Sequence, residues 1–161
     1  MPLYIVTILL LWLGFVQPAW TDTDSGSTFV VGADPDLSAG SVALQGGRFE
    51  EGIRLTLKGL QRTISPRQRA TAMSNLCAGY TMSGDYDAAI AQCNEALALG
   101  YNTWRIYNNR ALAYMFKGQL EAAQDDVDTG LSMNPDSKKL RQVQQMVNVR
   151  ALTPRVIIRD E

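Results

Sequence analysis

The apolar positions between about residues 39 and 152 recur every three or four residues, in segments that are separated by glycine-centred turns. This period places the apolar side chains of each segment on one face of a helix, so the pattern predicts helices rather than strands. One turn centres on Gly84 and another on Gly118, and each lies between two such segments. The expected fold class is therefore all-α and built from helix hairpins.

The sequence also repeats itself at a shift of 34 residues. The stretch GDYDAAIAQCNEAL begins at Gly84, and GQLEAAQDDVDTGL begins at Gly118. A fixed period of this length is typical of stacked helix hairpins, in which small residues let the paired helices approach closely. A helical bundle whose repetition has no functional meaning is the alternative, and the strict period argues against it. The shift aligns Asn75 with Asn109, Tyr80 with Tyr114, Gly84 with Gly118, Ala89 with Ala123 and Leu97 with Leu131.

This repeat resembles the tetratricopeptide repeat, whose 34-residue unit follows the pattern W-x2-L-G-x2-Y, then A-x3-F, then Pro. The best copy runs from Tyr107 to Pro135, and only Arg110 departs from it, because Leu is usual at that place. A second copy runs from Met73 to Tyr101, where Tyr101 replaces the closing Pro. The first copy matches through Tyr107, Ala111, Tyr114, Ala123, Val127 and Pro135, and the second through Met73, Leu76, Cys77, Tyr80, Ala89 and Cys93.

The resemblance implies a right-handed superhelix of hairpins, an α-solenoid, closed by a capping helix. We expect a degenerate repeat at about 37–66, good repeats at about 69–101 and 103–135, a capping helix at about 137–152 and a tail at 153–161. The degenerate repeat has Gly52 and Gly59 within its second helix, and each costs about 1 kcal/mol relative to Ala. Its other matching places are Gly40, Ala43, Gly47 and Phe49.

The N-terminus has the pattern of an export signal. Residues Leu3 to Val16 are almost purely apolar, and the first charged side chain is Asp22. A run of that length is short for a helix that spans about 30 Å of hydrocarbon, so we expect a signal peptide at 1–21 and an exported, periplasmic or secreted protein. An uncleaved membrane anchor is the alternative, because no Lys or Arg precedes the run. The polar, Gly- and Ser-rich residues 22–36 are expected to form a linker.

Composition argues against catalysis and against nucleic acid as a partner. The 161 residues contain no His, which removes the commonest general base and zinc ligand. The 15 basic and 16 acidic residues form no long run of one sign that would hold phosphates. We therefore expect no enzyme activity, no cofactor and no metal. The acidic run DDVDTG, Asp125 to Gly130, is interpreted as a solvated helix face rather than a calcium loop.

The resemblance implies that the concave side of the stack binds a partner peptide or protein, so an exported adaptor or scaffold is expected. The rival is a structural or self-associating subunit of an envelope complex, whose groove is filled by its own linker or by a second copy. The simplest alternative is that the positions matching the lining of the concave side are ordinary helix positions that bind no ligand. The places that match the lining are Thr71, Ser74, Asn75, Ala78, Met82, Arg105, Asn108, Asn109, Leu112 and Phe116.

The two cysteines, Cys77 and Cys93, stand 16 positions apart, far from the C-x-x-C redox spacing. In the expected hairpin they lie on the facing sides of its two helices at similar heights. A disulfide in an oxidising compartment is therefore predicted, with two buried thiols as the alternative.

Overall fold

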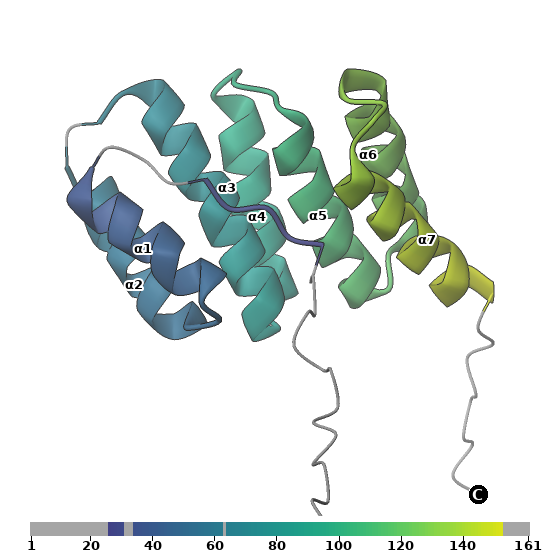
Figure 1. The fold of residues 1–161 in the computed structure, drawn as a ribbon, viewed down its shortest axis with the longest axis horizontal. Coiled ribbons are helices and arrows are strands. Elements are labelled where there is room, and N and C mark those ends of the chain that lie inside the picture. Colours follow the sequence, from purple (N-terminus) through teal and green to yellow (C-terminus); the bar gives the residue numbers. More distant parts are fainter. Residues whose placement is uncertain (1–25, 31–33, 63, 153–161) are drawn as a thin grey trace, which may run out of the picture.

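The structure is a computed structural model that describes residues 26–30, 34–62 and 64–152. These residues form seven α-helices and no strand (Figure 1). The helices pair as hairpins, α1 with α2, α3 with α4 and α5 with α6, and α7 packs against α5 and α6. The predicted all-α solenoid of helix hairpins is confirmed. Its helices are α1 (Pro35–Gln45), α2 (Phe49–Leu60), α3 (Pro66–Ser83), α4 (Tyr86–Ala98), α5 (Trp104–Lys117), α6 (Leu120–Met133) and α7 (Lys138–Leu152).

The hairpin turns repeat in structure as they do in sequence. Gly84 and Gly118 end α3 and α5 with φ of 89° and 86°, a left-handed conformation that favours glycine. Beyond each turn, a small residue of the second helix is fully buried against the first helix: Ala89 in one hairpin and Ala123 in the other. The 34-residue period therefore corresponds to one hairpin geometry that occurs twice in the chain.

The first hairpin explains why α2 contains glycines. A Cβ atom at Gly52 would lie 2.5 Å from Leu44 Cγ, and one at Gly59 would lie 2.5 Å from Leu37 Cδ2. Neither contact is compatible with a side chain, so glycine lets α2 pack directly on the leucines of α1. This close packing offsets the low helix propensity of glycine.

Helix α1 begins two residues inside the predicted linker because Asp34 caps it. Asp34 Oδ1 accepts hydrogen bonds from the main-chain N–H groups of Asp36 (3.0 Å) and Leu37 (3.1 Å), and Pro35 follows as the first helical residue. Asp34 Oδ2 accepts a further bond from Arg62 at 3.2 Å. The Leu37 N–H, supported by Arg62, holds the pKa of the Asp34 carboxyl below its ordinary value of 3.8.

Arg110, which departs from the repeat pattern, forms an ion pair that ties three helices together. Its Nε and one terminal nitrogen donate to the Asp126 carboxylate of α6 at 2.8 and 2.6 Å. The other terminal nitrogen donates to Asn94 Oδ1 of α4 at 2.7 Å. Hydrogen bonding to Asp126 raises the pKa of the Arg110 guanidinium. The interpretation of DDVDTG as a solvated face is wrong for Asp126, which is 4% exposed because it binds this arginine.

Several sequence predictions lie outside the described residues. They concern the signal peptide at 1–21, the alternative anchor, the start of the linker and the tail at 153–161. Among the residues that the structure does describe, no helix combines the length and apolar character needed to cross a bilayer.

Candidate functional site

A short extended segment, Gly26–Val30, lies across one face of the helix stack. We call it the N-terminal segment, and the face formed by α3, α5 and α7 the groove. Figure 1 shows the segment in front of α5 and α3, running from the α7 side toward α1, opposite to the order of the helices. Residues Gly26, Ser27 and Thr28 are buried, whereas Val30 is 36% exposed. A stretch of polar sequence without helical periodicity thus forms part of the packed domain.

Asn75 of α3 binds the main chain of Val30 through both polar atoms of its side-chain amide. Its Oδ1 accepts from the Val30 N–H at 2.8 Å, and its Nδ2 donates to the Val30 carbonyl at 2.7 Å. The side-chain amide therefore satisfies one residue of an extended chain in the way that a neighbouring β-strand would. Because the bonds reach only main-chain atoms, Asn75 recognises an extended conformation rather than a side chain.

Asn109 of α5 does the same for Thr28. Its Oδ1 accepts from the Thr28 N–H at 2.9 Å and from the Thr28 hydroxyl at 3.1 Å, and its Nδ2 donates to the Thr28 carbonyl at 2.9 Å. The same Nδ2 also donates to the Ser74 carbonyl at 3.1 Å, which fixes the orientation of the amide. Asn109 is fully buried, so each of these bonds is shielded from water.

The segment reaches α7 at Gly26. Asn108 Nδ2 donates to the Gly26 carbonyl at 2.7 Å, and Gly26 has a φ of 75°. A Cβ atom there would lie 3.3 Å from Val143 Cγ2 and 3.5 Å from Leu112 Cδ1, so glycine suits both the conformation and the space. Within the described part of the chain, the buried Oδ1 of Asn108 and hydroxyl of Ser27 have no hydrogen-bond partner.

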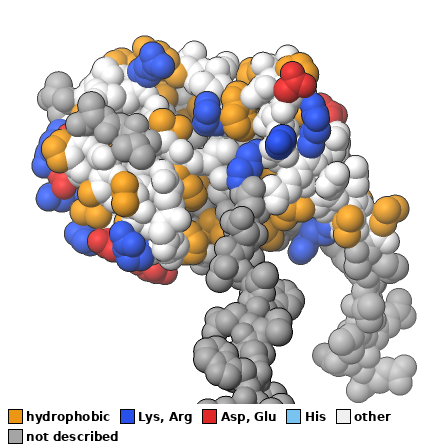
Figure 2. Space-filling view, viewed as in Figure 1, with side chains coloured by type: hydrophobic (Ala, Val, Ile, Leu, Met, Phe, Trp, Pro, Cys, Tyr) orange, Lys and Arg blue, Asp and Glu red, His pale blue; other side chains and the backbone are white. Residues whose placement is uncertain are grey.

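A shallow hollow with basic walls adjoins Val30 at the other end of the segment. Thr71 and Ser74 of α3 line it together with Arg67 and Arg105. The Arg105 guanidinium lies over the Trp104 ring, 4.5 Å from its centroid, and its side chain is exposed. In the space-filling view of this face, Lys and Arg side chains lie both near the middle and along the margins, whereas the visible Asp and Glu side chains lie at the margins (Figure 2). The exposed end of the segment thus lies in a positively charged setting.

The ten residues predicted to line the groove fall into three groups. Asn75, Asn108, Asn109, Ser74 and Leu112 surround the N-terminal segment, and Thr71 and Arg105 line the hollow beside Val30. Met82 and Phe116 lie apart from it, in a small pocket beside Tyr86 at the C-terminal ends of α3 and α5. Ala78 is fully buried and offers no surface to a ligand.

Sequence reasoning missed two components of this site. The first component is the N-terminal segment, which lies within the expected linker at 22–36 and corresponds to the rival interpretation of a groove filled by its own linker. The second component is Val143, which is not among the residues predicted to line the groove. One signal was available for it, because Val143 stands 34 positions after Asn109, as Asn109 stands 34 after Asn75.

The structure joins Cys77 of α3 to Cys93 of α4 as a disulfide, with 5.3 Å between the Cα atoms. Both residues are fully buried at the contact of the two helices. This separation lies within the range that disulfides require. The bond lies within the hairpin that carries Asn75, so it would fix one wall of the groove. Whether the two thiols are oxidised in the mature protein stays a prediction.

Comparisons with known proteins agree with this geometry. A family model described as tetratricopeptide repeat matches residues 105–137. The first TPR domain of the human RPAP3 protein, solved by NMR, is 22% identical with a TM-score of 0.61, over 74% of this chain and 94% of that one. No curated protein matches the sequence significantly.

Two further similar structures contain a bound peptide. The second TPR domain of human RPAP3, in complex with the HSP70 peptide SGPTIEEVD, is 21% identical with a TM-score of 0.60, covering 70% of this chain and 92% of that one. The first TPR of Spaghetti (RPAP3), bound to the HSP90 peptide SRMEEVD, is 21% identical with a TM-score of 0.63, covering 72% and 93%. At these identities the likeness establishes the fold.

Proposed function

We propose that this chain, which matches the tetratricopeptide repeat at residues 105–137 and has the fold of TPR domains, is a non-catalytic interaction module whose groove binds an extended segment of a partner protein. The observation that carries this proposal is the pair of amides, Asn75 and Asn109, each bound to the N–H and carbonyl of one extended residue. Side chains that bind main-chain groups accept any segment of the right conformation and width. The peptide complexes of the two RPAP3 domains support the same use of the fold.

In the proposed mechanism the N-terminal segment occupies the groove until a partner segment displaces it. Only four residues separate Val30 from Pro35, where α1 begins. A tether this short gives the segment an effective concentration of about millimolar or more. A partner must therefore bind more tightly than the segment does, and the segment limits binding to well-matched partners.

We further propose that this module works outside the cytoplasm as an adaptor or scaffold. Support comes from the apolar run at Leu3 to Val16, the small residues after it and the buried cysteine pair, which suits an oxidising compartment. Signal cleavage would leave a periplasmic or secreted protein, and an uncleaved run would leave one anchored to the membrane.

A structural role is the second candidate, and the occupied groove favours it specifically. If the segment of one copy enters the groove of another, the chain is a self-associating subunit rather than an adaptor. Sedimentation of the mature protein separates the two candidates. A monomer that retains the segment in its own groove supports the adaptor, and a stable dimer or chain of copies supports the structural subunit.

The test of the adaptor uses Thr28→Pro, because proline removes the N–H that Asn109 accepts and so releases the segment without altering the groove. Capture of partners from the envelope of the native host should increase with this variant. Adding Asn75→Ala and Asn109→Ala should then abolish capture, since each change removes two main-chain bonds. Thr28→Ser, which retains the N–H, and Asn148→Ala, on the exposed side of α7, are the matched controls.

If the triple variant captures the same proteins as Thr28→Pro alone, the groove does not bind the partner and the proposal fails. The Asn variants are made in the Thr28→Pro background for a physical reason. In the unmodified chain the Asn variants would weaken binding of both the N-terminal segment and the partner to the groove. The two effects on partner capture would then cancel.

A further inference from the structure

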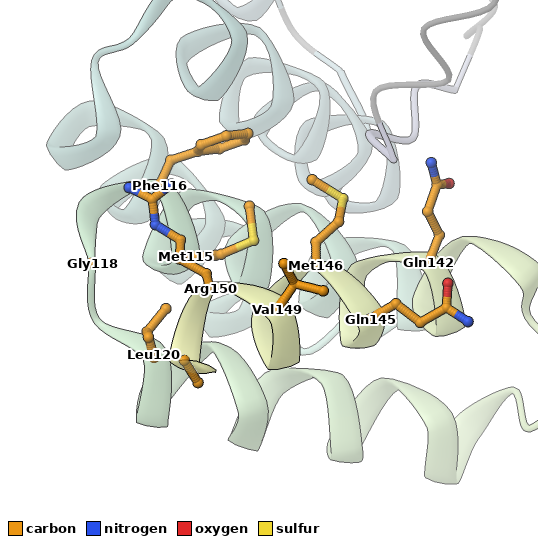
Figure 3. A pocket seen from close by; sticks show the side chains of 10 residues that line it. Met115, Phe116, Gly118, Leu120, Gln142, Gln145, Met146, Val149 and Arg150 are labelled. Atoms are coloured by element: carbon orange, nitrogen blue, oxygen red, sulfur yellow. The ribbon is translucent and has the colours of Figure 1, made fainter. Parts of the chain in front are cut away.

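A second hollow adjoins the groove at its α7 end. It has a volume of about 940 Å³ and lies between the C-terminal halves of α5 and α7. Figure 3 shows its apolar lining, with the side chains of Met115, Phe116 and Leu120 from one side and Met146 and Val149 from α7. Gln142, Gln145 and Arg150 form its polar edge. We call it the methionine pocket.

The methionine pocket lies one helical turn from the residues that flank Gly26. Gly26 lies against Leu112 of α5 and Val143 of α7. Met115 and Phe116 follow Leu112 by one helical turn, and Met146 follows Val143 by one turn. One turn is about 5.4 Å, and one extended residue spans about 3.3 Å. In a bound partner segment, a side chain one or two positions before the place of Gly26 is therefore within reach of the pocket.

The residues that directly precede Gly26 in this chain are polar. Asp24 and Ser25 are the two residues before Gly26, and Thr21, Asp22 and Thr23 precede them. Two polar atoms beside this end, Asn108 Oδ1 and the Ser27 hydroxyl, are also left unpaired within the described residues. Within the described residues, the groove thus pairs with both main-chain groups of Thr28 and Val30 but leaves two polar atoms beside Gly26 unpaired.

We propose that the methionine pocket is a specificity site for partner segments, and that it accepts a large apolar side chain one or two residues before a glycine that takes the place of Gly26. The proposal rests on the function proposed above and names the class of segment that the groove prefers. Its occupant is an extended partner segment, because the pocket begins one helical turn from Leu112 and Val143, the residues of the groove that lie against Gly26. Burial of that side chain gives the partner the advantage it needs to displace the segment.

The test uses the full chain with Thr28→Pro, so that the groove is free, and fluorescent ten-residue peptides. One peptide has the sequence of residues 22–31, DTDSGSTFVV. Two others carry Asp24→Leu or Ser25→Leu, and a fourth carries Asp24→Asn to control for loss of charge. We expect the better leucine peptide to bind at least about tenfold more tightly than the first, which is the gain from burying one such side chain. Asp24→Asn should change binding by less than about threefold.

The pocket is tested from the protein side with Met146→Gln, which keeps the length of the side chain and removes its apolar character. This change should eliminate the gain from leucine and leave binding of DTDSGSTFVV unchanged. If neither leucine peptide binds better, or the gain survives Met146→Gln, the pocket is not the specificity site although the groove still binds peptides. If no peptide binds at all, the proposed function itself fails.

Discussion

Asn75 and Asn109 stand 34 positions apart in sequence, and they hold Val30 and Thr28, which stand two positions apart in the bound segment. The next pair follows the same rule, because Gly26 lies against Val143, 34 positions after Asn109. Successive repeats therefore contact every second residue of the extended segment. Side chains of an extended chain alternate with the same period of two residues. At the third place valine replaces asparagine, so a steric limit that favours glycine is added to one main-chain hydrogen bond, from Asn108 to the Gly26 carbonyl.

The first prediction concerns the ion pair of Arg110 and Asp126. Arg110→Ala should lower the free energy of unfolding by about 3 kcal/mol, because it leaves a buried carboxylate without its partner. Urea unfolding measures this change. The double variant Arg110→Leu with Asp126→Ala should recover most of the loss, since Leu is usual at this place in the repeat. Lys117→Ala, which removes the partner of the exposed Asp87, should cost less than about 1 kcal/mol. An Arg110→Ala effect as small as that of Lys117→Ala would contradict the prediction.

A second prediction concerns Cys77 and Cys93. Protein isolated without reductant and then unfolded should show no reactive thiol. Reduction should destabilise the domain by on the order of 3 kcal/mol, as the chain-entropy model gives for a loop of about 15 residues. Two reactive thiols in the isolated protein would show that the pair is not oxidised.

The dependence of stability on pH follows from Asp34. Its pKa in the folded domain is lower than its ordinary value of 3.8, so its carboxylate stabilises the fold above that pH. The contribution is lost as the pH falls through the folded pKa. Asp34→Asn keeps an oxygen that can cap α1 but does not titrate. The difference in unfolding free energy between wild type and Asp34→Asn should therefore favour wild type near pH 6 and shrink below about pH 4. A difference that stays constant from pH 6 to pH 2.5 would contradict this mechanism.

Export predicts a new N-terminus between Trp20 and Asp22. Mass spectrometry of the protein from its native host should find a chain that has lost the apolar run and remains outside the cytoplasm. An intact Met1 or Pro2 terminus would instead support the anchored form. Either outcome leaves the N-terminal segment, Gly26–Val30, in the chain.

The sequence predicts the parts of this fold that depend on neighbouring residues. Glycine at 84 and 118 and alanine at 89 and 123 specify a turn and a close helix contact, so the two hairpins follow from the period alone. Occupancy of the groove is different, because Thr28 and Asn109 are separated by 81 positions and the segment has no helical or strand period. The pairing of Arg110 with Asp126 and Asn94 could not be predicted either, because it depends on how side chains of three packed helices face one another. Such contacts form only after the helices have packed.

Amide hydrogen exchange at Thr28 and Val30, followed by NMR on the full chain, tests the central claim most directly. Both N–H groups donate to asparagine side chains of the groove, so both should exchange at least about tenfold more slowly than in a free peptide of the same sequence. Asn109→Ala should accelerate exchange most at Thr28, and Asn75→Ala most at Val30. Exchange at the free-peptide rate at both positions in the unmodified protein would show that the groove does not hold an extended segment.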